Sequence, residues 1–179
     1  MGWTGQGTPL DLLAGSNHRM TQLSEIYNQR ILELSANIPD TPRLAKPDAT
    51  ATAHSKLCGS TVTVDIELGG DRVTGYGQTV KACLLGQAAA SVMGRNIVGA
   101  RTQELRDVAA AMRKMLKADG PPPEGRWADL AVLQPVKDYK ARHASTLLVF
   151  DAVEKALVEA EQKHAARSDD ANASASSSA

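Results

Sequence analysis

Apolar side chains recur at helical spacing near the start of the chain, from Thr21 to about Asn37. This spacing predicts an amphipathic helix, because positions three and four apart share one face. The apolar positions are Leu23, Ile26, Tyr27, Ile31 and Leu34. The stretch NIPDTPRLAKPDATA follows, and its three prolines predict an extended connector.

A strict alternation of apolar and polar positions replaces the helical spacing in STVTVDIEL, residues 60–68. Alternate side chains of a strand face opposite ways, so this stretch predicts a half-buried strand. The turn residues GGD at 69–71 and the return over 72–82 predict a hairpin. We expect TATAHSKL, just before Cys58, to add a third strand.

From Cys83 onward the pattern is helical almost to the end of the chain. Residues 83–95 predict a short helix of small side chains, which suits close packing against a sheet, and residues 102–117 predict an amphipathic helix. We expect a turn of helix around WADLAVL and a final helix over 150–161. A helix, a small antiparallel sheet and then several helices make an α+β fold.

The composition divides the chain into three expected segments. Residues 1–20 are rich in Gly, Thr and Asn and are expected to form a flexible arm. Residues 21–165 are expected to form the folded domain. The Ser/Ala/Asp-rich tail, 166–179, offers too little apolar area to offset its ordering entropy, so we expect it to be disordered.

Charge and hydropathy exclude several functional classes. The 179 residues carry 20 basic and 20 acidic side chains, which argues against a general nucleic-acid binder. No apolar run approaches the roughly 20 residues of a membrane span. The first residues also lack the pattern of a secretory signal. We therefore expect a cytoplasmic protein that binds neither nucleic acid nor membrane.

The chain has only two cysteines, Cys58 and Cys83, which are 25 positions apart. Cys58 precedes Gly59 where the chain enters the alternating strand, and Cys83 lies where a strand turns into a helix. A helix N-terminus favours a thiolate, and Lys56 and Lys81 each stand two positions before a cysteine. The two strands between the cysteines run antiparallel, so we expect both cysteines at the same end of the sheet.

Such a pair of thiols has three interpretations. It can hold a soft metal or a cluster, it can form a redox disulfide, or it can consist of two small buried apolar side chains with no chemical role. The spacing alone does not choose among them.

Four stretches of the sequence resemble the NifU/IscU-type family of iron–sulfur cluster scaffolds, in particular its SufU-like branch. They are IYNQRILELSANIP, HSKLCGSTVTVDIEL, VKACLLGQAAASVM and YKARHASTLLVFDAVEKAL. The resemblance covers roughly residues 20–161. It implies an N-terminal helix, a three-stranded antiparallel sheet, a helical C-terminal half and a scaffolding role rather than catalysis. It also implies a cysteine desulfurase and apo iron–sulfur proteins as partners.

The resemblance also implies a set of ligands. The family's Cys-Gly-Asp motif stands here as Cys58, Gly59 and Ser60, and its second cysteine is Cys83. The third cysteine is absent, since that position falls on Ser145 or, in the alternative alignment, beside His143.

The resemblance therefore implies that Cys58 and Cys83 bind iron or a transient [2Fe–2S] cluster. Imidazole can bind zinc or one iron of such a centre, so His143 is the best third ligand. Ser60 and Ser145 are poor ligands, and Ser145 is expected to cap the final helix. Two thiolates are too few for a cluster, so a second protomer, a partner protein or a small thiol is expected to add ligands. The alternatives are a zinc-binding regulatory module and a thiol enzyme.

Overall fold

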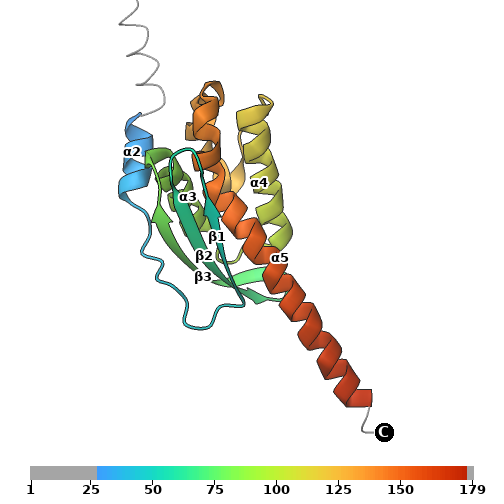
Figure 1. Cartoon of the computed structure of the whole chain (residues 1–179). Coiled ribbons are helices and arrows are strands. Elements are labelled where there is room, and N and C mark those ends of the chain that lie inside the picture. The colour runs from blue at the N-terminus through green and yellow to red at the C-terminus, as the bar shows by residue number, and fades with distance from the viewer. Residues whose placement is uncertain (1–27, 177–179) are drawn as a thin grey trace, which may run out of the picture.

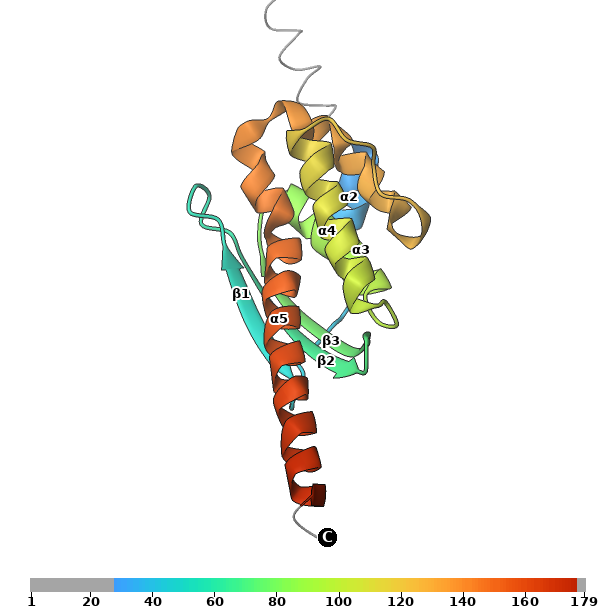
Figure 2. The same ribbon diagram turned by 90° about the vertical axis from the view of Figure 1, so that its right-hand side faces the viewer.

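The computed structural model describes residues 28–176, which form one sheet covered on one face by helices (Figures 1 and 2). The fold is α+β, as the sequence predicts. The elements are α2 (Gln29–Ala36), β1 (Ala49–His54), β2 (Thr61–Gly69), β3 (Arg72–Lys81), α3 (Leu84–Asn96), α4 (Thr102–Lys117), the 3₁₀ helix η1 (Gly125–Asp138) and α5 (Lys140–Ser176).

The sheet is antiparallel with the order β1-β2-β3, so the hairpin and the third strand are both confirmed. The alternation in β2 sorts its side chains between the two faces, with Val62, Val64 and Ile66 fully buried. This apolar face lies under α5, which crosses β1 and β2 (Figure 2). The core therefore lies between the sheet and the helices.

The small side chains of α3 allow that helix to lie close to α5. A Cβ atom placed on Gly86 would lie 2.8 Å from the carbonyl oxygen of Ser145. No residue larger than glycine fits this contact without a shift of the backbone. The run of small residues after Cys83 thus fixes the position of α5 relative to the start of α3.

The connector between α2 and β1 is extended, as predicted, and it covers part of the other face of the sheet. There the carboxylate of Asp65 is fully buried. It accepts hydrogen bonds from the Arg43 guanidinium at 2.5 and 2.9 Å, from the Leu44 backbone at 3.0 Å and from the Thr50 hydroxyl at 2.6 Å. A buried carboxylate with this many donors fastens the connector to β1 and β2.

The last helix differs from the prediction at both ends. It begins at Lys140 instead of Phe150 and continues to Ser176, so residues 166–176, expected to be disordered, are helical. Lys163 and Arg167 donate to the backbone oxygen and the carboxylate of Asp48, at 2.8 and 3.1 Å. These contacts hold the helix against the sheet beyond the point where its apolar stripe ends.

Two further expectations lie outside the described residues. These are the flexible arm, 1–20, and the start of the first helix, 21–27; residues 177–179 of the tail also lie outside. Within residues 28–176, no helix combines the length and apolar character needed to cross a bilayer.

Candidate functional site

Cys58 lies in the tight loop between β1 and β2. The loop is closed by two backbone hydrogen bonds of 2.9 Å, from Ser55 N to Ser60 O and from Gly59 N to Ser55 O. Gly59 has φ +69°, in the left-handed region that other residues adopt only at a cost. The glycine of the Cys-Gly motif is therefore required by the loop's backbone, which turns the Cys58 side chain out to solvent.

The Cys58 sulfur lies between two hydroxyls, 3.3 Å from Ser55 Oγ and 2.9 Å from Ser60 Oγ. Hydrogen bonds with the side chain of Ser55 and with the side chain and backbone of Ser60, and a smaller contribution from the Arg142 charge, lower the pKa of Cys58 to about 7. A large fraction of this thiol is consequently thiolate at neutral pH. The cation that acts on Cys58 is Arg142, not Lys56 as the sequence suggested.

Cys83 occupies the N-cap position of α3, at the junction of strand and helix that the sequence predicts. Its side chain is half-buried, and its sulfur lies 3.5 Å from the Ser145 hydroxyl. The prediction that Ser145 caps the final helix is wrong, because α5 begins five residues earlier and Ser145 is buried within it. Its hydroxyl also donates to the Arg142 carbonyl at 3.0 Å, as serine does inside helices.

The first turns of α5 connect the two cysteines. Arg142 acts on Cys58, and Ser145, three residues later on the same side of the helix, contacts Cys83. The sheet register agrees, since Thr61 at the start of β2 pairs with Lys81 at the end of β3. The β1–β2 loop and the start of α5 lie at the same end of the molecule (Figure 1). We call this end, with Cys58, Ser60, Cys83 and Ser145, the cysteine end.

His143 does not join this group. Its side chain is buried, and its Nε2 lies 3.1 Å from the carbonyl oxygens of both Val136 and Lys137 in η1. Two positions along a helix correspond to roughly 200° of rotation, so His143 and Ser145 face different sides of α5. Among residues 28–176, no three His, Cys, Asp or Glu side chains come together in a way that could hold a metal ion.

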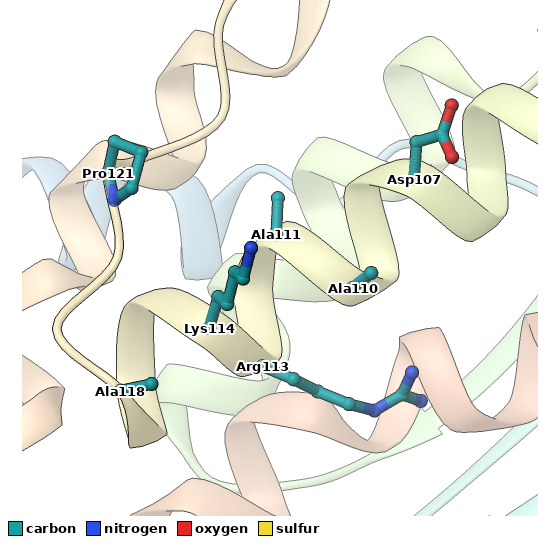
Figure 3. Close-up of a pocket in the computed structure, with 7 residues that line it drawn as sticks. All are labelled: Asp107, Ala110, Ala111, Arg113, Lys114, Ala118 and Pro121. Carbon is teal, nitrogen blue, oxygen red and sulfur yellow. The ribbon is translucent and has the colours of Figure 1, made fainter.

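A groove of about 690 Å³ lies elsewhere, along the outer side of α4 (Figure 3). Its lining holds no thiol or imidazole, and its Arg113 is paired with Asp151 at 2.7 Å and with Glu154. The groove therefore offers no metal chemistry. The lining residues are Asp107, Ala110, Ala111, Arg113, Lys114, Ala118 and Pro121.

Ser145 was predicted from the sequence as a helix cap, and its contact with Cys83 was not predicted. The spacing from Arg142 already indicated that Ser145 stands where the family has its third cysteine, and its contact with Cys83 agrees with that alignment over the one through His143. Ser55 was missed entirely. Its only signal was a serine three residues before Cys58, and its role depends on the loop closing back on itself.

Known proteins resemble this chain in sequence and in fold. No protein-family model matches the chain. A curated relative, the iron–sulfur cluster assembly scaffold protein IscU of Thermotoga maritima, is 25% identical over 134 residues, which are 74% of this chain and 92% of the relative.

Two crystal structures share the fold. A NifU-like protein (N-terminal) from Brucella abortus is 55% identical, with TM-score 0.78, over 79% of this chain and 99% of that one. FiSufU, a SUF-system scaffold from Fervidobacterium islandicum, has TM-score 0.68 over 75% of this chain and 98% of its own. At 22% identity it supports the fold alone. On the strength of the Brucella relative, the chain belongs to the NifU/IscU/SufU family of iron–sulfur cluster assembly scaffolds, whose members are not catalysts.

Proposed function

We propose that this chain is a scaffold or carrier that binds iron or a transient [2Fe–2S] cluster through the thiolates of Cys58 and Cys83. One observation carries the proposal. Cys58 is exposed and Cys83 is half-buried at the same end of the fold, and each sulfur contacts a serine, Ser60 or Ser145, at a position where the family has a ligand.

The donor set fits soft iron–sulfur chemistry. Thiolates are the usual ligands of such clusters, and a thiol must release its proton to bind iron. A Cys58 pKa of about 7 makes this release inexpensive at neutral pH. Ser60 and Ser145 contact the sulfurs through hydroxyls, which are weaker ligands than thiolates, and this suits a cluster that is bound weakly and passed on.

The proposed role implies partners and a setting. A cysteine desulfurase would supply sulfur, and apo iron–sulfur proteins would accept the finished cluster. The expected folded unit, residues 21–165, would perform this role in the cytoplasm. These assignments follow from the family and from the proposed cargo.

The test is anaerobic reconstitution of the full chain with ferrous iron and sulfide. Visible charge-transfer absorption, with iron and sulfide in equal amounts, is expected from the unmutated chain and is expected to be lost in Cys58→Ala. His54→Ala is the control, since His54 is exposed at the end of β1, just before the same loop. A colourless, iron-free product from the unmutated chain would contradict the proposal. Stoichiometric zinc that survives iron treatment would instead indicate a zinc-binding module.

A further inference from the structure

We infer that the C-terminal extension of α5, residues 166–176, docks into the groove along α4 of a second copy of this chain. The exchange is reciprocal, so each chain offers one extension and one groove, and the pair has twofold symmetry. No residue of the extension or of the groove lining belongs to the cysteine end, so the inference goes beyond the proposed function and does not depend on it.

The extension is helical although every one of its residues is exposed. Residues 166–176 continue α5 well past Ala160, the last residue of that helix that is buried. Asp, Asn and Ser make up much of this stretch, and they favour a helix less than alanine does. Helices in proteins gain most of their stability from packing against other elements. We therefore expect a surface of another molecule to cover this part of α5.

The groove on α4 has the length and the lining that suit a docked helix. It lies between α4 and the segment that follows it, and small apolar residues line it, namely Ala110, Ala111, Ala118 and Pro121 (Figure 3). Small side chains let the backbone of a second helix approach closely. From Asp107 to Ala118 the groove follows α4 for roughly 16 Å, and the extension is about 15 Å long.

The extension of a chain does not reach the groove of the same chain. The helix α4 runs toward the cysteine end, whereas α5 begins there and its extension projects past the sheet at the opposite end (Figures 1 and 2). The extension can therefore fill only the groove of another molecule. Because each chain carries both parts, two equal contacts form in each pair and double the area that is buried.

The groove carries a charge that is not paired within the described residues. Lys114 lies in the lining, one turn of helix from Ala110 on one side and from Ala118 on the other. No carboxylate in residues 28–176 pairs with Lys114, whereas the neighbouring Arg113 pairs with two carboxylates of α5. A helix that covers this groove must therefore place an anionic side chain between small ones.

The extension supplies this pattern of side chains. Asp170 lies one turn of helix from Ala166 and from Ala173, so these three residues share one face. All three are exposed, and no cation in the described part of the chain pairs with Asp170. When Asp170 lies opposite Lys114, alanines of the two helices meet on either side of the ion pair. This match of size and charge favours a second copy as the occupant of the groove.

The experiment measures self-association of the full apo chain by sedimentation velocity, in reducing buffer, from about 1 µM to about 1 mM. The mass is expected to rise from that of one chain, 18.9 kDa, to twice that value as the concentration increases. Hydrogen exchange followed by mass spectrometry gives a second measurement. The amides of residues 166–176 should exchange more slowly as the dimer forms, because the docked helix opens less often.

Charge reversal tests the pairing of the two surfaces. Lys114→Glu is expected to weaken the dimer on the order of tenfold, because it places a carboxylate against Asp170. Asp170→Lys should weaken it to a similar degree by placing two cations together. The double variant, Lys114→Glu with Asp170→Lys, should recover most of the affinity, since opposite charges meet again. Lys155→Glu is the control, at an exposed position of α5 outside both the groove and the extension.

Each outcome supports or overturns the inference. A chain that keeps its own mass at every concentration would overturn it and leave the groove to a different partner. Equal weakening by Lys114→Glu and Lys155→Glu, or no recovery in the double variant, would overturn the pairing of groove and extension. A dimer in which the amides of residues 166–176 exchange as fast as in the single chain would do the same. None of these measurements involves iron or sulfide, so the proposed function stands or fails separately.

Discussion

In residues 28–176, charged groups on the sheet face under the α2–β1 connector are paired within the chain, whereas those at the cysteine end are not. Under the connector, the buried carboxylate of Asp65 is bonded to a guanidinium, a hydroxyl and a backbone amide. At the cysteine end, the exposed cation Arg142 acts on a thiol and has no carboxylate partner among the described residues. Charges that are paired within the chain hold its parts together, whereas unpaired ones remain available to a ligand.

The contact between α4 and α5 also consists of charges that are paired within the chain. Arg106 pairs with Glu161, and Arg113 pairs with both Asp151 and Glu154. These half-exposed pairs join two helices, and each adds modestly to stability. These pairs therefore help to fix α5, whose first turns reach the cysteine end, against α4.

The largest effect is expected from Asp65→Ala, which removes the buried carboxylate under the connector. The substitution leaves the Leu44 amide and the Thr50 hydroxyl without their acceptor, so the free energy of unfolding should fall by about 2–4 kcal/mol. Urea unfolding followed by circular dichroism measures this change. Asp71→Ala is the control, since Asp71 is exposed and lies 3.8 Å from Arg101, and it should change stability by less than about 0.5 kcal/mol.

The same carboxylate predicts a pH dependence. Burial alone would raise the pKa of Asp65, but hydrogen bonds from Arg43, Thr50 and Leu44 bring that pKa below its ordinary value. Its stabilising contribution is thus present above the unfolded-state pKa of about 3.9 and is lost as the pH falls through the lower folded-state pKa. An equal acid sensitivity of Asp65→Ala and the unmutated chain would contradict this account.

An intermediate effect is expected from Gly86→Ala, at the contact between α3 and α5. The added Cβ would lie 2.8 Å from the Ser145 carbonyl oxygen, so α5 must shift, at a cost of about 1–3 kcal/mol. Cluster formation should also slow, because Ser145 moves relative to Cys83. Gly94→Ala on the same helix is the control, since its Cβ would meet the side chain of Pro39 at 2.9 Å, far from the cysteines. Unchanged cluster formation in Gly86→Ala would show that the fit of α3 against α5 does not matter for the site.

The smallest effect on stability, and the sharpest test of the open end, is expected from Ser60→Ala. The loss of one hydroxyl should raise the pKa of Cys58 above about 7. The rate of alkylation by iodoacetamide, followed against pH by mass spectrometry, should then reach its midpoint at higher pH. Ser168→Ala, an exposed position near the far end of α5, should leave the midpoint unchanged. An unshifted midpoint in Ser60→Ala would rule out the hydroxyl as a cause.

The elements that depend on local pattern could be predicted from the sequence. The alternation in β2 and the small residues after Cys83 identified the hairpin and α3, because each pattern reflects burial on one face. The final helix was predicted too short at both ends. Its exposed extension gives no apolar signal, and the contacts of Lys163 and Arg167 with Asp48 join residues more than 100 positions apart.

The candidate site shows the same division. Cys58 and Cys83 could be placed at one end of the sheet from the antiparallel hairpin alone. The environment of the Cys58 thiol could not, because Ser55 reaches it through a closed loop and Arg142 through the packing of α5. His143 was predicted as a third ligand from a resemblance in sequence, which did not show that its imidazole would lie against the carbonyls of η1.

The length of α5 has a consequence for shape. Its 37 residues make a rod about 55 Å long, which begins at the cysteine end and projects past the sheet at the other end (Figure 1). Because this rod projects past the sheet, the chain has a larger radius of gyration than a compact chain of the same length. Small-angle X-ray scattering of the chain would show whether the rod keeps its full length in solution.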